Sequence, residues 1–335
     1  MYKEYFKLSG YPFRLTPDTD YLYMSPSHSR AKAYMECAIF NREGFVVITG
    51  EIGSGKTTLI KKLLTELNDN VLVAKIFQTQ LDEVELLQAI LVEFGLNPFR
   101  SKKVELLNML NQFLINSYLE GKQVLLIIDD AQNLSKRCLE EITMLSGVET
   151  QKEKILHVIL VGQPELSYTI ESSDMEQLLQ RVSLRFHMRP LMIDEIQEYV
   201  EHRLNVAGSA ESLFKTGVYE YIYEYTGGTP RLINTLCDTA LTCAYADDMK
   251  KAGKKEFIAA VEELQWQKFS ERTIIRDENE KNRRRRLEDN DREMEDLISR
   301  YDESLSGGSE ASITSLALVK IANQLKRIAD HLDNK

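Results

Sequence analysis

Four short apolar runs, rich in β-branched residues, recur through the first 190 residues of the chain. They cover 45–49 (FVVIT), 71–77 (VLVAKIF), 124–128 (VLLII) and 157–161 (HVILV). Nearly uninterrupted apolar runs of this length are typical of strands that are buried on both faces of a parallel sheet. A fifth strand is expected at 184–189 (LRFHMR), immediately before Pro190.

Stretches with helical periodicity separate these runs, at 56–67, 82–94, 104–119 and 135–146. This alternation predicts a three-layer α/β domain around a parallel sheet. After Pro190 only helical patterns follow, at 194–206, 213–225, 231–246 and 255–267. Gly208, the Gly227-Gly228 pair with Pro230, and Gly253 mark the breaks between them. We therefore expect a sheet domain over 1–190 and a small helical lid over 191–268.

The composition changes again near residue 270. Residues 269–303 are densely charged and predict a solvated helix, because acidic neighbours neutralise the arginines at 283–286. Residues 304–312 have the composition of a flexible linker. Residues 313–335 carry the a/d spacing of a coiled coil, with Leu318, Ile321, Leu325, Ile328 and Leu332. About two heptads are too few for an isolated dimer, so this segment either docks on a partner helix or frays.

Composition and charge narrow the class of protein. Hydrophobic residues make up 43 % of the 335, enough for a folded core, and the net charge of −10 disfavours a general nucleic-acid binder. The four cysteines show neither a C-x-x-C pair nor zinc-ligand spacing. The N-terminus MYKEYFKLSGYPF lacks the pattern of a signal peptide, and no apolar run reaches about 18 residues. We expect a cytoplasmic protein without a membrane span.

The first strand leads directly into a phosphate-loop motif, Gly50-Glu51-Ile52-Gly53-Ser54-Gly55-Lys56-Thr57-Thr58. Its glycines allow a tight turn whose N–H groups point inward at an anion, and the following helix aims its positive end at the same place. Lys56 is expected to reach the β- and γ-phosphates of ATP, and Thr57 to place its hydroxyl on Mg²⁺. The alternative, a glycine-rich surface loop, fits poorly between an apolar strand and an apolar-striped helix.

The third strand ends in Asp129-Asp130, at the sheet edge where ligands bind in open α/β folds. We expect Asp129 to hold Mg²⁺ through its water shell and Asp130 to orient or activate the attacking water. The alternative is that both carboxylates cap the following helix. Many related ATPases carry Glu at the second position, so Asp130 implies either slow hydrolysis or a closer water.

Several motifs in order along the chain resemble those of the ExeA-type AAA+ ATPases. These are Tyr11-Pro12-Phe13, Thr16-Pro17-Asp18 and Tyr23, then GEIGSGKTT, IIDDAQNL, LVGQPEL, QRVSLRFHMRPL and TGGTPRLINTLCDTAL. The resemblance covers residues 1 to about 268. That family includes ATPases of secretion, of pilus biogenesis (MshM) and of exopolysaccharide and exosortase loci. ExeA itself continues into a membrane span and a peptidoglycan-binding domain, patterns that this sequence lacks, and this difference disfavours direct remodelling of the cell wall.

The resemblance implies roles for further residues. Gln163 is similar to sensor 1, which touches the γ-phosphate or the water, and Arg231 to sensor 2, which links the lid to the γ-phosphate. Pro12 and Phe13 resemble the wall on the adenine side. Alternatively, Gln163, which precedes a proline, caps a turn. The alternative for Arg231 is that it is a solvated arginine on the surface.

Arg181 resembles the arginine finger that one subunit gives to its neighbour's ATP, and Arg185 is the reserve candidate. A guanidinium supplied in trans stabilises charge on the transferring phosphoryl oxygens. The alternative for both is a solvated arginine near a strand edge.

Taken together, the sequence predicts an AAA+ ATPase that binds and hydrolyses ATP with Mg²⁺ and forms a homo-oligomer, either a ring or a filament. Its energy would drive a protein partner in secretion, pilus assembly or polysaccharide export. Two other functions stay open: a DNA-transposition ATPase similar to TniB or MuB, which the acidic charge disfavours, and a slow nucleotide-gated interaction switch.

Overall fold

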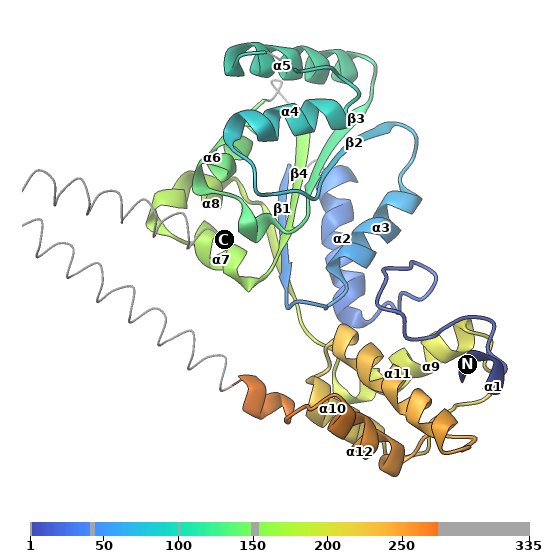
Figure 1. The fold of residues 1–335 in the computed structure, drawn as a ribbon. Helices are drawn as coiled ribbons and strands as arrows, with labels where there is room; N and C mark the ends of the chain where they lie inside the picture. Colours follow the sequence, from blue (N-terminus) through green and yellow to red (C-terminus); the bar gives the residue numbers. More distant parts are fainter. Residues whose placement is uncertain (1, 41–43, 100, 149–153, 274–335) are drawn as a thin grey trace, which may run out of the picture. The chain divides into compact units, whose positions relative to one another are not determined.

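Five parallel strands form one sheet in the order β2-β3-β4-β1-β5. The computed structural model describes residues 2–40, 44–99, 101–148 and 154–273. The strands are β1 (Phe45–Gly50), β2 (Val71–Ile76), β3 (Gln123–Ile128), β4 (Leu156–Gly162) and β5 (Leu184–Met188). All five predicted strands are confirmed, and the three-layer parallel-sheet fold with them (Figure 1).

The register of the strands brings three segments with predicted site residues to one edge of the sheet. Thr49 of β1 pairs with Gly162 of β4, and Ile128 of β3 pairs with Leu160 of β4. The residues that follow these strands are the phosphate loop, Asp129 and Gln163. Because parallel strands present their carboxyl ends at the same edge, segments far apart in sequence converge there.

Helices cover both faces of the sheet. On one face, α2 (Pro26–Phe40) and α3 (Lys56–Glu66) pack against alternate strand residues such as Val46 and Ile48. On the other, α4 (Glu83–Glu93), α5 (Lys103–Leu119) and α6 (Lys136–Leu145) pack against Phe45 and Val47. The four predicted helices of this domain are confirmed to within a residue or two. The sequence analysis did not predict α2, α7 (Pro164–Ile170) or α8 (Glu176–Arg181).

The lid consists of α9 (Ile193–Val206), α10 (Tyr219–Thr226), α11 (Pro230–Ala246) and α12 (Lys254–Glu263). The helix expected over 213–225 begins only at Tyr219. Phe214 instead pairs with Ala252 in an isolated parallel bridge, and Gly217 has a positive φ of 84°, which a helix does not accommodate.

The N-terminal segment shares its core with the lid. Tyr2 of α1 (Tyr2–Tyr5), Leu8 and Phe13 are buried in one cluster with apolar side chains of α9, α11 and α12. The hydroxyl of Ser9 donates to the carbonyl of Ala207 at 2.8 Å. The domain boundaries as a whole stay predictions, but residues 2–13 pack with the lid rather than with the sheet.

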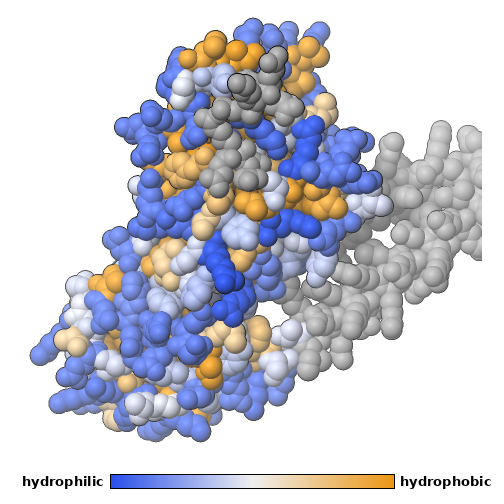
Figure 2. Space-filling view, turned by 180° about the vertical axis from the view of Figure 1, so that it is seen from behind, coloured by the Kyte–Doolittle hydropathy of each residue, from blue (hydrophilic) through white to orange (hydrophobic). Residues whose placement is uncertain are grey.

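The surface is hydrophilic over much of the face that Figure 2 shows, with apolar areas scattered over it. Exposed apolar side chains on α5 include Val104, Ile115 and Leu119. None of the helices that the structure describes has the length and apolar composition needed to cross a bilayer. Residues 1–268 form one compact unit. The predicted linker, the predicted heptad segment and the part of the predicted charged helix beyond residue 273 lie outside the described residues.

Candidate functional site

A cavity of about 510 Å³ opens at the carboxyl edge of the sheet. Its volume falls within the usual range for small-molecule sites. The phosphate loop and α3 form one wall, and the N-terminal segment, α9 and α11 form the other. Lining residues include Arg14, Asp18, Tyr21, Tyr23, His28, Gly53, Gly55, Lys56, Thr57, Asp130, Gln163, Tyr199, Arg203, Arg231 and Asn234.

The phosphate loop depends on two glycines with positive φ. Gly53 has φ of 80° and Gly55 of 97°, a region that residues with a Cβ rarely enter. A Cβ on Gly53 would lie 2.5 Å from the Cβ of Arg231. Gly55 precedes α3 without any side-chain cap, so the first N–H groups of that helix face the cavity uncapped. This cradle fits a phosphate group.

Lys56 is buried at the start of α3, and its ammonium lies across the loop. Its Nζ donates to the carbonyl of Gly50 at 2.6 Å and to that of Glu51 at 2.9 Å. Burial lowers the pKa of this ammonium, and the nearby carboxylates of Asp129 and Asp130 oppose the shift. A phosphate anion in the loop would favour the charged form further.

Thr57 and Asp129 bring a hydroxyl and a carboxylate together. The hydroxyl of Thr57 donates to Oδ2 of Asp129 at 2.7 Å. Asp129 is buried, which raises the pKa of its carboxyl group, while the bond from Thr57 opposes that shift. Such oxygen donors are the ligands that Mg²⁺ prefers, usually one or two carboxylates with phosphate oxygens. These two residues therefore fit the predicted Mg²⁺.

Asp130 and Gln163 line the cavity and are connected through Gln132. Gln132 donates from Nε2 to Oδ1 of Asp130 at 3.2 Å and accepts at Oε1 from the backbone N–H of Gln163 at 2.9 Å. Asp130 has φ of 53°, an uncommon backbone conformation that is enriched at functional sites. Gln132 belongs to the IIDDAQNL motif, whose pattern alone did not indicate this bridging contact.

The capping alternatives for these residues find no support in the side-chain contacts. Neither Asp130 nor Gln163 makes a side-chain cap bond to the helix that follows it. The hydroxyl of Ser135 caps α6 instead, by accepting from the N–H of Cys138 at 3.2 Å. The catalytic roles of Asp130 and Gln163 stay predictions.

Arg231 joins the lid to the phosphate loop. Its backbone N–H, in the first turn of α11, donates to the carbonyl of Gly53 at 3.1 Å, and its side chain lines the cavity. Pro230 occupies the first turn of α11, where its missing N–H costs no helical hydrogen bond. The position agrees with that expected of a sensor 2 residue, whose role stays a prediction.

Arg181 and Arg185 do not line the cavity of their own chain. Arg181 is exposed at the end of α8, with its guanidinium close to Gly147. Arg185 is exposed on β5 and pairs with Glu171 at 2.8 Å. A role for either residue in hydrolysis would therefore require a second subunit.

Pro12 and Phe13 do not line the cavity, and their role as the wall on the adenine side stays a prediction. Phe13 is 2 % exposed and packs against Phe214, with ring centroids 5.9 Å apart. Its apolar ring contributes more in the lid core than at a polar cavity. The neighbouring residues 14–18 and 21–23 line the cavity instead.

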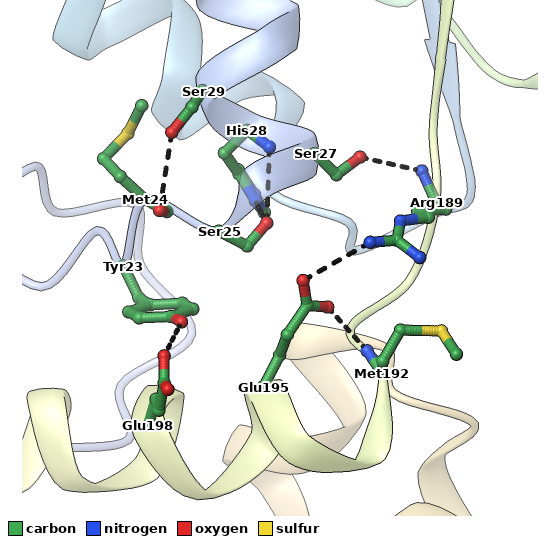
Figure 3. A network of polar contacts seen from close by, with 10 residues as sticks. All are labelled: Tyr23, Met24, Ser25, Ser27, His28, Ser29, Arg189, Met192, Glu195 and Glu198. Atoms are coloured by element: carbon green, nitrogen blue, oxygen red, sulfur yellow. Dashed lines mark hydrogen bonds and ion pairs between the residues drawn. The ribbon is translucent and has the colours of Figure 1, made fainter.

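His28, which no sequence motif indicated, lines the cavity and contacts the backbone of the phosphate loop. It is buried at the start of α2, and its Nε2 lies 3.0 Å from the carbonyl of Ser54 (Figure 3 shows its bond to Ser25). Since a carbonyl only accepts, Nε2 carries the proton, and Nδ1 accepts from the hydroxyl of Ser25 at 2.7 Å. Burial lowers the pKa of His28, which favours this neutral form.

We expect His28→Leu to weaken ATP binding about fivefold, the effect of one buried hydrogen bond on the loop geometry. His28→Gln, whose amide N–H can occupy the position of Nε2, should restore most of the affinity. Calorimetric titration of ATP into each variant measures this, with thermal melting to verify folding. Equal affinities in the wild type and His28→Leu would contradict the supporting role.

Comparison with known proteins agrees with this geometry. Residues 40–170 match the family model described as an AAA domain. The chain is 38 % identical over 247 residues to general secretion pathway protein A of Aeromonas hydrophila, which confirms the resemblance stated from the motifs. The alignment covers 73 % of this chain and 45 % of that protein, so the chain spans less than half of the relative's length.

Solved structures show the same fold at low identity. The ORC2 protein of Aeropyrum pernix, solved in ADPNP–ADP complexes, aligns with a TM-score of 0.54 and 18 % identity over 74 % of this chain and 72 % of that chain. Cdc6p of Pyrobaculum aerophilum aligns with a TM-score of 0.58 and 18 % identity over 78 % and 70 %. These likenesses confirm the fold.

Proposed function

We propose that this chain, which has the AAA+ ATPase fold and resembles the ExeA-type proteins, binds ATP with Mg²⁺ and hydrolyses it. One observation carries the proposal. The phosphate loop, Lys56 and the Thr57–Asp129 pair converge on the cavity at the sheet edge. Each of these groups has the chemistry that a bound triphosphate and its cation need.

The residues around the cavity have separate roles in hydrolysis. Lys56 and the loop N–H groups bind the phosphates, and Mg²⁺, when bound, neutralises charge on them. Asp130 orients the attacking water, and Gln132 fixes its carboxylate relative to Gln163. Arg231 couples the γ-phosphate to the position of α11 in the lid, because its backbone N–H already bonds to the carbonyl of Gly53 in the phosphate loop.

The energy of hydrolysis drives a conformational change in a protein partner. By likeness to general secretion pathway protein A, the partner is proposed as a component of a secretion system. The family resemblance of the motifs adds pilus and polysaccharide-export systems to the proposal. Since the chain spans only 45 % of that relative, its partner and process rest on the matched portion alone.

ATP turnover measured across protein concentrations tests the proposal. We expect specific activity to rise with protein concentration as subunits associate, because the arginine finger, Arg181, comes from a second subunit. Asp130→Asn should lower turnover by about 100-fold or more while it still binds ATP. Specific activity that stays low and independent of concentration would favour the slow nucleotide-gated switch instead.

The DNA-transposition alternative is tested separately. A net charge of −10 opposes the neutralisation of phosphates that DNA binding requires. We expect no salt-sensitive shift of duplex DNA when the protein is added with ATP, and such a shift would favour the alternative.

A further inference from the structure

Arg203, on α9, is a buried arginine that the proposed mechanism does not use. It is 8 % exposed, and its guanidinium donates to three backbone carbonyls of the N-terminal segment. The bond from Nε to Pro12 is 2.6 Å, that from Nη2 to Arg14 is 3.3 Å, and that from Nη1 to Tyr21 is 3.5 Å. A fourth contact joins Nη1 to the hydroxyl of Tyr199 at 3.3 Å.

Aromatic rings complete the surroundings of this guanidinium. Its Cζ lies 5.2 Å from the ring centroid of Tyr21 and 5.7 Å from that of Tyr199. The four hydrogen bonds that its guanidinium donates within the described residues all go to uncharged oxygens, three carbonyls and one hydroxyl. Burial of an unpaired charge is costly, so the carbonyl bonds and the ring contacts must compensate for it. Arg203 thereby fixes the path of the segment between Pro12 and Tyr21.

That segment forms a wall of the cavity. Residues 14–18 and 21–23 line it together with the phosphate loop, and Arg203 lines it as well. If the phosphates lie at the loop, as the proposed function requires, the ribose and base extend toward this wall. Leu15 is 53 % exposed, so an apolar side chain is available there for contact with a base.

Immediately after this wall the chain passes from its contact with α9 of the lid to the start of α2, as Figure 3 shows. The hydroxyl of Tyr23 bonds to Glu198 of α9, on the lid side. Two residues later, Ser25 bonds to His28, which holds the phosphate loop. The wall is therefore anchored to the lid, whereas the phosphate cradle is anchored to the sheet.

We propose that Arg203 is a positioning residue for the nucleoside half of the ligand. It holds the wall formed by residues 14–23 on the lid, so that a nucleotide bridges two separately anchored surfaces. This inference rests on the proposed ATP site. It distinguishes two contributions to affinity: the phosphates bind through the sheet, and the base and ribose bind through the wall that Arg203 orders.

The test compares two ligands on the same variants. Calorimetry measures the affinity of Arg203→Met and Arg203→Lys for ATP and for inorganic tripolyphosphate, which has no nucleoside. We expect the Kd for ATP to rise about tenfold in both variants, because lysine cannot reproduce the planar fork that reaches three carbonyls. The Kd for tripolyphosphate should change less than about twofold. In turnover, KM should rise while kcat at saturating ATP is kept.

A matched control removes another anchor of the same segment. Ser9→Ala deletes the bond from the Ser9 hydroxyl to the carbonyl of Ala207, outside the nucleotide cavity, and keeps the bond from the backbone N–H to the same carbonyl. It should leave both affinities unchanged. Unchanged ATP affinity in the Arg203 variants, or an equal loss for ATP and tripolyphosphate, would overturn the positioning role. If Arg203→Met fails to fold, Arg203→Lys decides alone. A wild-type protein that binds neither ligand would instead refute the ATP site itself.

Discussion

Lys56→Ala is expected to abolish ATP binding, with the Kd raised at least about 100-fold, or about 2.7 kcal/mol. The ammonium of Lys56 is the buried cation of the phosphate loop, held by the carbonyls of Gly50 and Glu51. Its loss leaves the loop N–H groups without a neutralising charge for the β- and γ-phosphates. Calorimetric titration with Mg²⁺ and ATP measures the effect directly.

Lys62→Ala is the matched control for that experiment. Lys62 lies on the same helix, α3, but pairs with Glu66 at 3.1 Å and does not line the cavity. We expect its ATP affinity to equal that of the wild type. If Lys56→Ala keeps its fold, as thermal melting would show, and still binds ATP with undiminished affinity, the phosphate-loop assignment is wrong.

The fold was predictable where local pattern and burial agree. Strands β1, β3 and β4 are fully or almost fully buried, so their apolar runs carry a clear pattern. α2 was missed because its apolar residues alternate with serine, histidine and lysine, without a strong stripe. The start of α10 was misjudged because Gly217 and a tertiary bridge from Phe214 to Ala252 interrupt a continuous helical pattern.

The site was predictable where its residues are adjacent in sequence, as in the phosphate loop. His28 and Arg203 escaped prediction because their partners lie far away along the chain, at Ser54 and Pro12. No sequence pattern predicts which distant group accepts a hydrogen bond from a buried histidine or arginine. Phe13 was assigned to the adenine side, but its burial in the lid core is decided by the tertiary fold.

If the chain binds ATP as proposed, the placement of the sheet and lid residues lets the nucleotide state control the conformation. Arg231 connects α11 to Gly53, and the N-terminal wall connects α9 to the opposite side of the cavity. A ligand that differs between its two states by one phosphate changes contacts at the cradle, while its base remains at the wall. Only such a differential interaction shifts a conformational equilibrium.

Arg181→Ala is expected to leave ATP binding unchanged and to lower turnover by about 1,000-fold. Arg181 does not line the cavity of its own chain, so its loss leaves the binding residues in place. Its exposed position at the end of α8 leaves the guanidinium accessible to a neighbouring subunit. Calorimetry and a phosphate-release assay on the same preparation separate the two effects.

Mixing two inactive variants tests whether the active site is shared. Subunits with Arg181→Ala keep an intact Asp130, and subunits with Asp130→Asn keep an intact Arg181. If Arg181 acts in trans, an interface between them rebuilds one complete site, so the mixture should regain a measurable fraction of wild-type turnover. Arg185→Ala, which breaks only the pair with Glu171, serves as the control and should turn over normally. The assignment of Arg181 as the arginine finger would be contradicted if mixed assemblies regain no turnover, or if Arg185→Ala loses activity and Arg181→Ala does not.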